Sequence, residues 1–246
     1  MLVHNKGLVK TVKFADPKYV GDPINAVKIF NEKEVDELIV LDIDASIENR
    51  DPDFTLIKNL AAECRMPLCY GGGVKSVEHA KKIINLGAEK VALSSVAVEN
   101  PKLVSEIAEE VGRQSVIVVV DIRKKGLLGK YEVFTHNGTR ATGKNPKDFA
   151  QEVERLGVGE IVVNSIDNDG VMKGYDMKLI ESIRESVNVP MTVLGGAGSL
   201  SDIKQIVDRF GVIGVAAGSL FVFKGIYKAV LINYPKRSEL EELIKS

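Results

Sequence analysis

An aspartate ends an unbroken apolar run near the middle of this sequence. Asp121 follows "SVIVVV", a composition typical of a strand that is buried on both faces. Burial disfavours the charged form of a carboxyl group and moves its pKa toward the range that suits general acid–base catalysis. Asp121 is therefore the candidate catalytic residue, although an aspartate at this place can also simply cap a loop or helix.

Two glycine-rich stretches have the composition of phosphate-binding loops. One contains Gly72 and Gly73 and the other Gly195 and Gly196, and each lies between an apolar run and an amphipathic run. Glycine lets backbone N–H groups approach an anion closely, and the following helix N-terminus favours negative charge. Small residues that could complete each site end the next apolar run, namely Ser94, Ser95, Gly218 and Ser219. One copy could be merely a tight turn, but two copies at matched spacing predict a substrate with a phosphate at each end.

Polar residues also stand at both ends of other apolar runs. Some follow a run and could bind substrate or form ordinary turns; these are Asp44, Asn164, Ser165, Asp167 and Asp169. Others open a run, namely Glu37, Lys90 and Glu160. Charged residues that open inner strands are unusual. They are either a salt-bridge layer that closes one end of the sheet or a polar gate to a passage along its axis.

The elements that must position these residues alternate between strand and helix. Apolar runs predict buried parallel strands at 37–43, 67–71, 90–95, 115–122, 160–166, 190–195 and 212–218. Amphipathic patterns predict helices at 23–33, 53–65, 76–86, 101–112, 146–156, 176–186, 200–209, 224–232 and 237–245. Four of these helices are expected to start with an Asp or Asn cap followed by proline, at 22–23, 51–52, 100–101 and 145–146.

An internal repeat explains how seven strands can belong to a closed barrel. "DELIVLDIDAS" at 36–46 matches "GEIVVNSIDND" 123 residues later, and "YGGGVKS" at 70–76 matches "LGGAGSL" 124 residues later. We therefore expect an α/β fold, a single (β/α)8 TIM barrel domain over 1–246, built from two (βα)4 half-barrels at about 1–114 and 115–246. An open doubly wound sheet would carry a G-x-G-x-x-G motif, which is absent. The first strand is expected to be truncated, with its missing part before Leu2.

Composition and charge exclude several other classes of protein. The 246 residues carry 33 basic and 34 acidic side chains, so binding to nucleic acid through bulk charge is disfavoured. Cys64 and Cys69 lack zinc or disulfide spacing, and the three histidines form no metal motif. His136, in a loop after the 115–122 strand, could touch substrate. No apolar run is long enough to span a membrane, and the first residues show no basic region followed by an apolar one. We therefore expect a cytoplasmic protein without metal or cofactor.

The motifs together resemble those of the cyclase subunit of imidazole glycerol phosphate synthase. "LDIDAS", "YGGGVKS", "GAEKVALSS", "VFTHNGTRATG" and "LGGAGS" carry the resemblance, which runs from about Lys10 to Phe223. It implies a barrel that takes ammonia from a glutaminase partner docked at its N-terminal face. The ammonia then reacts with a phosphorylated substrate in a lyase–cyclase step of histidine biosynthesis.

Individual residues can be matched to the roles that this family implies. Asp121 matches one of two catalytic aspartates, and Lys10 matches a loop lysine that holds substrate. The residues that open strands, Glu37, Lys90 and Glu160, match members of a charged ring at the ammonia entrance. The glycine loops and Ser95 and Ser219 match the two phosphate sites.

The chain departs from the family at a catalytic position. Leu2 stands where the resemblance and the internal repeat both place the second aspartate, while Ser94 replaces a usual Asn and Asn164 a usual Thr. Three hypotheses follow. The chain is a divergent member that forms an acetamidino group on a sugar of surface polysaccharide, an ordinary histidine-pathway cyclase, or a non-catalytic scaffold that conducts ammonia.

Overall fold

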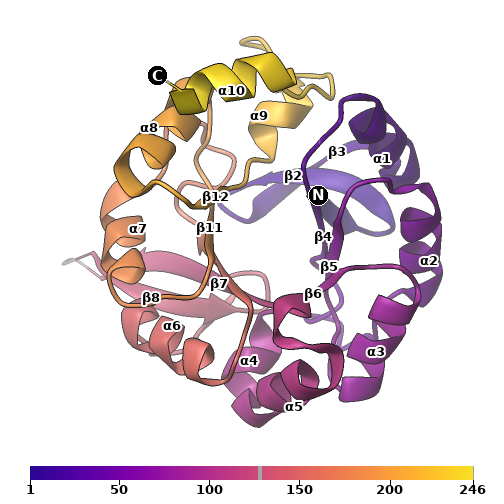
Figure 1. Ribbon diagram of the computed structural model, residues 1–246, viewed down its shortest axis with the longest axis vertical. Coiled ribbons are helices and arrows are strands. Elements are labelled where there is room, and N and C mark those ends of the chain that lie inside the picture. Colours follow the sequence, from indigo (N-terminus) through magenta and orange to yellow (C-terminus); the bar gives the residue numbers. More distant parts are fainter. Residues whose placement is uncertain (127–128, 246) are drawn as a thin grey trace.

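Eight parallel strands form the wall of a barrel in the computed structural model, which describes residues 1–126 and 129–245 and the side chains up to residue 243. Figure 1 shows these strands ringed by helices. In spatial order they are β1 (Leu2–His4), β4 (Leu38–Asp42), β5 (Leu68–Gly71), β6 (Lys90–Leu93), β7 (Val116–Lys125), β10 (Glu160–Ser165), β11 (Met191–Leu194) and β12 (Gly214–Val215). The (β/α)8 barrel predicted from the repeat is confirmed. Among the described residues, no strand pairing joins β12 to β1.

The helices cover the outside of the sheet, as expected where parallel strands are buried on both faces. They are α1 (Pro23–Glu32), α2 (Phe54–Glu63), α3 (Val77–Asn85), α4 (Ser95–Glu99), α5 (Pro101–Val111), α6 (Pro146–Arg155), α7 (Met177–Arg184), α8 (Leu200–Phe210), α9 (Ser219–Val222) and α10 (Arg237–Lys245). A short 3-10 turn, Arg113–Ser115, precedes β7.

Three of the four proline-led helix starts are confirmed. Helices α1, α5 and α6 begin at the expected proline. Asp22 caps α1 by accepting from the Asn25 N–H at 2.9 Å, and Asn145 caps α6 by accepting from the Lys147 N–H at 2.9 Å. The expected cap of α5 is not formed, because the Asn100 side chain makes no cap hydrogen bond. The start predicted at 51–52 is wrong. Helix α2 begins two residues later, because Asp53 caps it by accepting from the Leu56 N–H at 2.9 Å.

Each half-barrel extends its first strand into an antiparallel hairpin. Strand β1 pairs with β2 (Gly7–Val12), which pairs with β3 (Ala15–Gly21), and β7 pairs with β8 (Lys130–Thr135), which pairs with β9 (Arg140–Ala141). These hairpins project beyond the carboxyl ends of the strands. The repeat inferred from sequence is thus visible in the topology of both halves.

One predicted feature of the fold is confirmed and another is wrong. The first strand is short, as expected: β1 spans Leu2–His4, and its Leu2 and Val3 pair in parallel with β4. Residues 224–232 form no helix. After α9 the chain makes a hairpin of β13 (Phe223–Lys224) and β14 (Ala229–Val230), with Gly225 at a φ of 71° in its turn. A left-handed glycine conformation ends a helical pattern and suits a turn instead.

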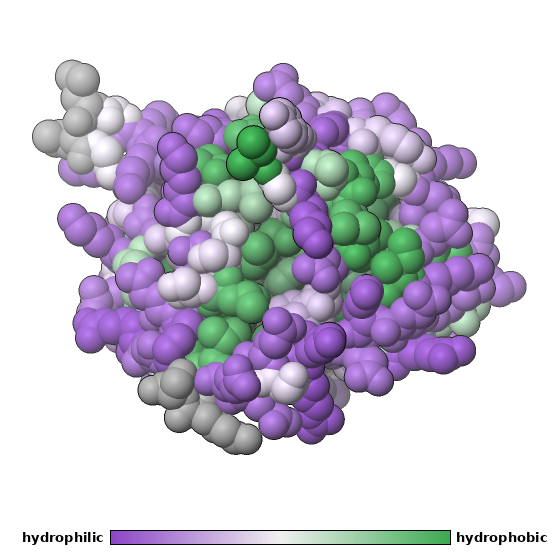
Figure 2. All heavy atoms as spheres, turned by 90° about the horizontal axis from the view of Figure 1, so that it is seen from above, coloured by the Kyte–Doolittle hydropathy of each residue, from purple (hydrophilic) through white to green (hydrophobic). Residues whose placement is uncertain are grey.

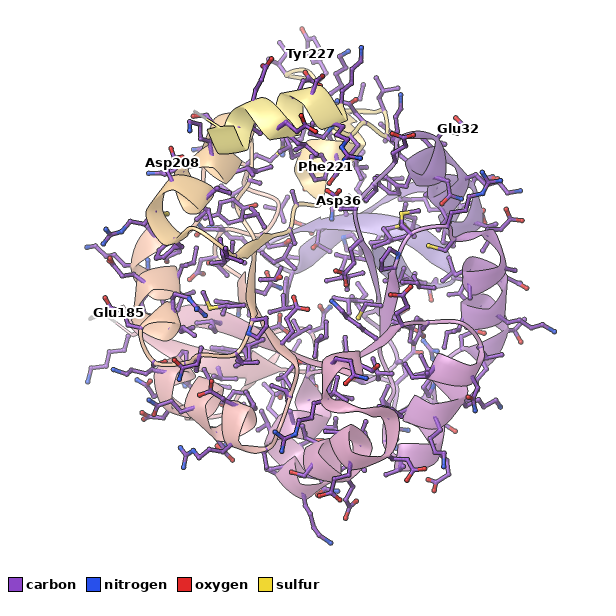
Figure 3. All side chains as sticks on the ribbon, viewed as in Figure 1. Glu32, Asp36, Glu185, Asp208, Phe221 and Tyr227 are labelled. Atoms are coloured by element: carbon purple, nitrogen blue, oxygen red, sulfur yellow. The ribbon has the colours of Figure 1, made fainter. Side chains whose placement is uncertain are left out.

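The flank that carries this hairpin has an uneven surface. Figure 2 looks onto it from above Figure 1 and shows green apolar areas between purple polar ones. Its exposed apolar side chains include Ile226, Tyr227, Val230 and Leu231. In Figure 3, Tyr227 lies at the outer edge of the molecule, whereas Asp36 and Phe221 lie nearer the centre of the ring.

The core has two layers that differ in what they touch. The larger layer lies between the strands and the helices and includes Val40, Val91, Val118, Ile161 and Val193, all with no more than 1 % of their surface exposed. A second, smaller layer fills the inside of the barrel and consists of Cys69, Ala92, Ile117, Val119 and Val162. Alternation along each strand sends successive side chains to opposite layers. The inner layer lies between the two ends of the barrel, and Ala92 and Val119 of this layer line the cavity described below.

Candidate active site at the carboxyl ends of the strands

A cavity of about 430 Å³ connects the two ends of the barrel. At the carboxyl ends of the strands it is lined by most of the residues predicted to bind substrate or phosphate: Lys10, Gly72, Gly73, Ser94, Ser95, Asp121, Asn164, Asp169, Gly195, Gly196, Gly218 and Ser219. At the opposite end, the floor, it reaches Glu37 and Glu160. The folded chain therefore gathers residues from both half-barrels around one space.

Asp121 lies in this cavity as a buried carboxylate with polar neighbours. Its Oδ1 accepts from Asn164 Nδ2 at 2.9 Å, and its Oδ2 faces the Ser94 hydroxyl at 3.4 Å. Burial raises the pKa of Asp121 to about 7, with help from the charge of Asp169, while the bonds from Asn164 and Ser94 oppose the rise. A carboxyl group with such a pKa can take up or release a proton near neutral pH.

The repeat-related place in the first half-barrel is apolar. Leu2 is directly opposite Leu41 in the β1–β4 register, just as Asp121 is directly opposite Asn164 in the β7–β10 register. Both leucines line the cavity. The structure therefore places Leu2 at the position equivalent to Asp121 and leaves this side of the mouth without a carboxylate at that level.

The glycine pairs take backbone shapes that a side chain would prevent. Gly72 and Gly195 have φ of 121° and 92°, and a Cβ on either would lie 2.6 Å from a backbone carbonyl oxygen. Each pair is followed by a helix that a serine caps, Ser76 for α3 and Ser199 for α8. These features suit anion binding by backbone N–H groups.

Lys10, on the hairpin of the first half, lies against the loop of the second half that ends with Ser219. Lys10 is 8 % exposed, and its Nζ is so near Gly218 that a Cβ on this glycine would lie 2.1 Å from it. Burial lowers the pKa of Lys10, and the charge of Asp169 opposes this effect. The structure thus brings an amino group to the loop that ends with Ser219.

Two aspartates accept hydrogen bonds from backbone N–H groups. The sequence alone did not decide whether these residues bind a ligand or form turns. Asp44 Oδ2 accepts from the Asn5 N–H at 2.8 Å, and Asp167 Oδ2 accepts from the Lys124 N–H at 2.9 Å. Each bond ties the first strand of a half-barrel to the loop after its second strand. Asp44 also contacts His4, with Oδ1 and Nδ1 2.6 Å apart, a pair that the sequence analysis did not identify.

Charged residues form a closed group at the floor. Lys90 Nζ lies 2.8 Å from Glu37 and 2.9 Å from Glu160, and Thr192 donates to Glu160 at 2.5 Å. Although burial disfavours the charge on Lys90, the two carboxylates raise its pKa. Beside this group the Tyr234 hydroxyl donates to Asp36 at 2.6 Å. Thr192 and Tyr234 were missed in the sequence because a single hydroxyl carries no spacing pattern.

Two further residues do not occupy the positions expected for substrate contacts. Ser165 is 5 % exposed but is not on the cavity wall, because it follows Asn164 on a strand and alternation turns its side chain away. His136 lies behind Ser95, whose hydroxyl accepts from the His136 N–H at 3.1 Å. Asn137 reaches the cavity instead.

The described part of the chain has no helix with both the length and the apolarity that a bilayer crossing requires.

Comparison with known proteins shows the family. Residues 2–228 match the family model described as "Histidine biosynthesis protein". The chain is 56 % identical over 243 residues to "Putative imidazole glycerol phosphate synthase subunit HisF" of Leptospira interrogans, covering 99 % of this chain and 96 % of that protein. It is 54 % identical over 241 residues to a protein of Pseudomonas aeruginosa with the same name and the symbol hisF2, covering 98 % and 96 %. Identity to the HisF subunit of Hyphomonas neptunium is 42 % over 215 residues, covering 87 % and 84 %.

The fold and the cavity define a (β/α)8 barrel with its polar site at the carboxyl ends of the strands, the arrangement of barrel enzymes. The chain belongs to the histidine biosynthesis protein family. Within that family it is HisF-like, similar to cyclase or lyase-type enzyme subunits of imidazole glycerol phosphate synthase.

Proposed function

We propose that this chain is an ammonia-using synthase subunit of a glutamine amidotransferase complex, and that it acts on a phosphorylated small molecule. The twin glycine loops with Lys10 suit the phosphates, and Asp121 suits proton transfer. The floor group of Glu37, Lys90 and Glu160 suits a gate through which ammonia enters the cavity. A glutaminase subunit, HisH-like by analogy with the family, would dock at this N-terminal face, in the cytoplasm.

One observation favours a divergent reaction over ordinary cyclisation. The register that places Asp121 beside Asn164 in one half places Leu2 beside Leu41 in the other. One positioned proton-transfer group contributes roughly 10²–10⁴-fold to rate, so a site with Asp121 in one half and Leu2 at the equivalent position should be poor at a reaction that needs a carboxylate at both positions. Leu2, "GLVKTVKF" at 7–14 and "AAGSLFVFKG" at 216–225 resemble the branch of the family that is associated with surface polysaccharide. On that resemblance we assign the ammonia to an acetamidino group on a sugar.

A second candidate is the histidine-pathway cyclase, which the names of the relatives favour. An assay with the linear ribulosyl aminoimidazole substrate and excess ammonia separates the two. We expect its consumption to be about 10²-fold or more below that of an ordinary cyclase, the loss of one proton-transfer group. Turnover at the ordinary rate would overturn the sugar assignment.

The gate has its own test. In the complex with its glutaminase, Lys90→Ala should reduce glutamine-driven turnover more than turnover with free ammonia, because only the first needs passage through the floor. Lys102→Ala is the matched control, since the Lys102 side chain is 85 % exposed and, within the described residues, pairs with Glu106 one turn along the same helix. Equal losses in both assays for Lys90→Ala would mean that Lys90 only forms a structural salt bridge and does not act as a gate. They would also revive the alternative of a sealed floor, without ammonia conduction.

A further inference from the structure

Thr11 is a buried threonine that ties the first half-barrel to the second. It lies on β2, is 3 % exposed, and donates through Oγ1 to Asp169 Oδ2 at 2.7 Å. The two residues are 158 positions apart in the sequence, and Asp169 lines the cavity. A hydroxyl that donates to a carboxylate forms a stronger hydrogen bond than a neutral pair does. This bond therefore holds a side chain of the candidate active site from the other half of the molecule.

The backbone at this contact is shaped for close approach. The Lys13 N–H donates to the Asp169 carbonyl at 2.8 Å. Gly170 has a φ of 67°, and a Cβ there would lie 2.1 Å from the Thr11 carbonyl oxygen, so a side chain at this position would push the two segments apart. The pairing of β2 with β3 also shifts register at Thr11, an irregularity of the kind that re-aims side chains beside active sites. Backbone and side chain thus both join the hairpin of the first half to the loop after β10.

Thr11 directly follows the lysine at the mouth of the cavity. Lys10 Nζ lies so close to Gly218 that a Cβ on this glycine would be 2.1 Å away. A strand keeps successive side chains at a fixed spacing and direction, so a contact that holds Thr11 also limits where Lys10 can reach. The position of Lys10 against the loop that ends with Ser219 therefore depends on how firmly β2 is held.

The carboxylate that Thr11 holds acts on two other ionisable groups. Its negative charge adds to the effect of burial on the pKa of Asp121 and opposes the effect of burial on the pKa of Lys10. The side chains that contact the Asp121 carboxyl group directly, Asn164 and Ser94, are neutral. Since the interaction of two charges weakens as they separate, the place of Asp169 on the cavity wall matters for both groups.

We infer that Thr11 is a positioning residue of the site: its hydroxyl fixes the Asp169 carboxylate on the cavity wall and keeps the first hairpin, with Lys10, against the second half-barrel. This inference rests on the proposed function, since it takes the cavity as the place of the reaction. Thr11 itself is not among the described residues that line the cavity, so it acts through its neighbours. Loss of its hydroxyl should affect Asp169 and Lys10 together, whereas loss of a hydrogen bond elsewhere in the barrel should affect neither.

An NMR titration tests the inference without turnover. In the 13C-labelled full chain, the Asp121 carboxyl signal is identified by its loss in Asp121→Asn and is followed against pH. We expect its midpoint at about 7 in the unaltered chain. Thr11→Val keeps the branched shape of the side chain and removes the hydroxyl. It should lower this midpoint, because the charge of Asp169 is no longer held in place, and Thr11→Ser, which keeps a hydroxyl, should have the unaltered midpoint.

Binding of inorganic phosphate tests the effect on Lys10. The backbone N–H signals of two loops, at 72–73 and 218–219, are followed as phosphate is added to the 15N-labelled chain. Thr11→Val should weaken binding at 218–219 about tenfold, the effect of one lost hydrogen bond, and leave binding at 72–73 unchanged. Thr142→Val is the matched control. Thr142 Oγ1 donates to the Val133 carbonyl on β8 at 2.7 Å, so its loss should change neither phosphate binding nor the Asp121 midpoint.

The outcomes separate this inference from the proposed function. An unchanged Asp121 midpoint and unchanged phosphate binding in Thr11→Val would overturn the inference, as would equal changes in Thr142→Val. Asp169→Asn is the second variant if Thr11→Val does not fold, because it weakens the same hydrogen bond from the acceptor side. It should change both readouts in the same direction, and no change would again overturn the inference. If the unaltered chain binds phosphate at neither loop, the proposed function fails, and the Asp121 midpoint still decides whether Thr11 positions Asp169.

Discussion

The two half-barrels keep the same framework and differ in the pair of residues at one position. In the first half the pair is Leu2 and Leu41, and in the second it is Asp121 and Asn164, in identical strand register. By contrast, the aspartate that ties strand to loop is present in both halves, as Asp44 and Asp167. The contacts that hold the barrel together are thus repeated, whereas the pair of a carboxylate and an amide at this position is found in the second half only.

The largest expected effect comes from removing the carboxylate of Asp121. Asp121→Asn should reduce ammonia-dependent turnover by roughly 10²–10⁴-fold, the contribution of a positioned proton-transfer group. Leu2→Val in the apolar pair should cost less than a tenth of that factor, because it removes only packing. Initial rates with saturating ammonia measure both. Similar losses would show that the two halves contribute alike.

The same residue should make stability depend on pH. Since the folded pKa of Asp121 is raised from 3.8 to about 7, the native state holds a proton that the unfolded state has released between these values. Stability should therefore fall as pH rises from about 4 to about 7 and then level off, by roughly 1–4 kcal/mol. Asp121→Asn should remove this dependence and be the more stable form at pH 8. Urea unfolding at a series of pH values from 4 to 8 measures this free energy for both proteins. If it changes with pH in the same way in the unaltered chain and in Asp121→Asn, the dependence does not come from Asp121.

The repeated aspartates offer a matched pair of smaller changes. Asp167→Ala should destabilise the fold by about 1–3 kcal/mol, because a backbone N–H loses its acceptor. Asp44→Ala should cost at least as much, since it also releases His4. Thermal unfolding of the two variants compares them directly. A larger loss for Asp167→Ala would mean that His4 adds nothing to the first half.

The smallest effect is expected at the floor. Thr192 donates to Glu160 in the second half, whereas Glu37 in the first half pairs only with Lys90 among the contacts of the described residues. Thr192→Val should therefore cost about 0.5–1.5 kcal/mol, the worth of one hydrogen bond. Urea unfolding detects this change, and Thr192→Ser, which keeps the hydroxyl, is its control. An unchanged free energy of unfolding in Thr192→Val would mean that the Thr192–Glu160 hydrogen bond does not stabilise the second half of the floor more than the first.

Much of the fold could be predicted from local sequence patterns, and where the prediction was wrong the cause is also local. The apolar runs located seven barrel strands, because near-continuous apolarity is enough to mark a strand buried on both faces. The same reasoning failed at 224–232, where Gly225 turns the chain into a hairpin. The short first strand was expected from the internal repeat, and it pairs with β4.

For the candidate site, the sequence identified which residues matter better than it identified which side chains contact one another. The glycine loops, Asp121 and Lys10 were expected at the mouth and lie there. Ser165 was expected to touch substrate, but alternation turns its side chain away from the cavity. Nothing in the sequence indicated that His4 would meet Asp44 or that Thr192 would meet Glu160, because these contacts join segments 40 and 32 residues apart.

The sequence by itself determined the repeat, the glycine loops and the replacement of an aspartate by Leu2, because each is a matter of residue type and spacing. Only the tertiary structure decided which side chains meet. It paired Asp121 with Asn164, raised the pKa of Asp121 by burial, and left Asn164 Oδ1 without a donor. Hydrogen bonds and desolvation depend on neighbours brought together by strand register, and such neighbours lie far apart along the chain.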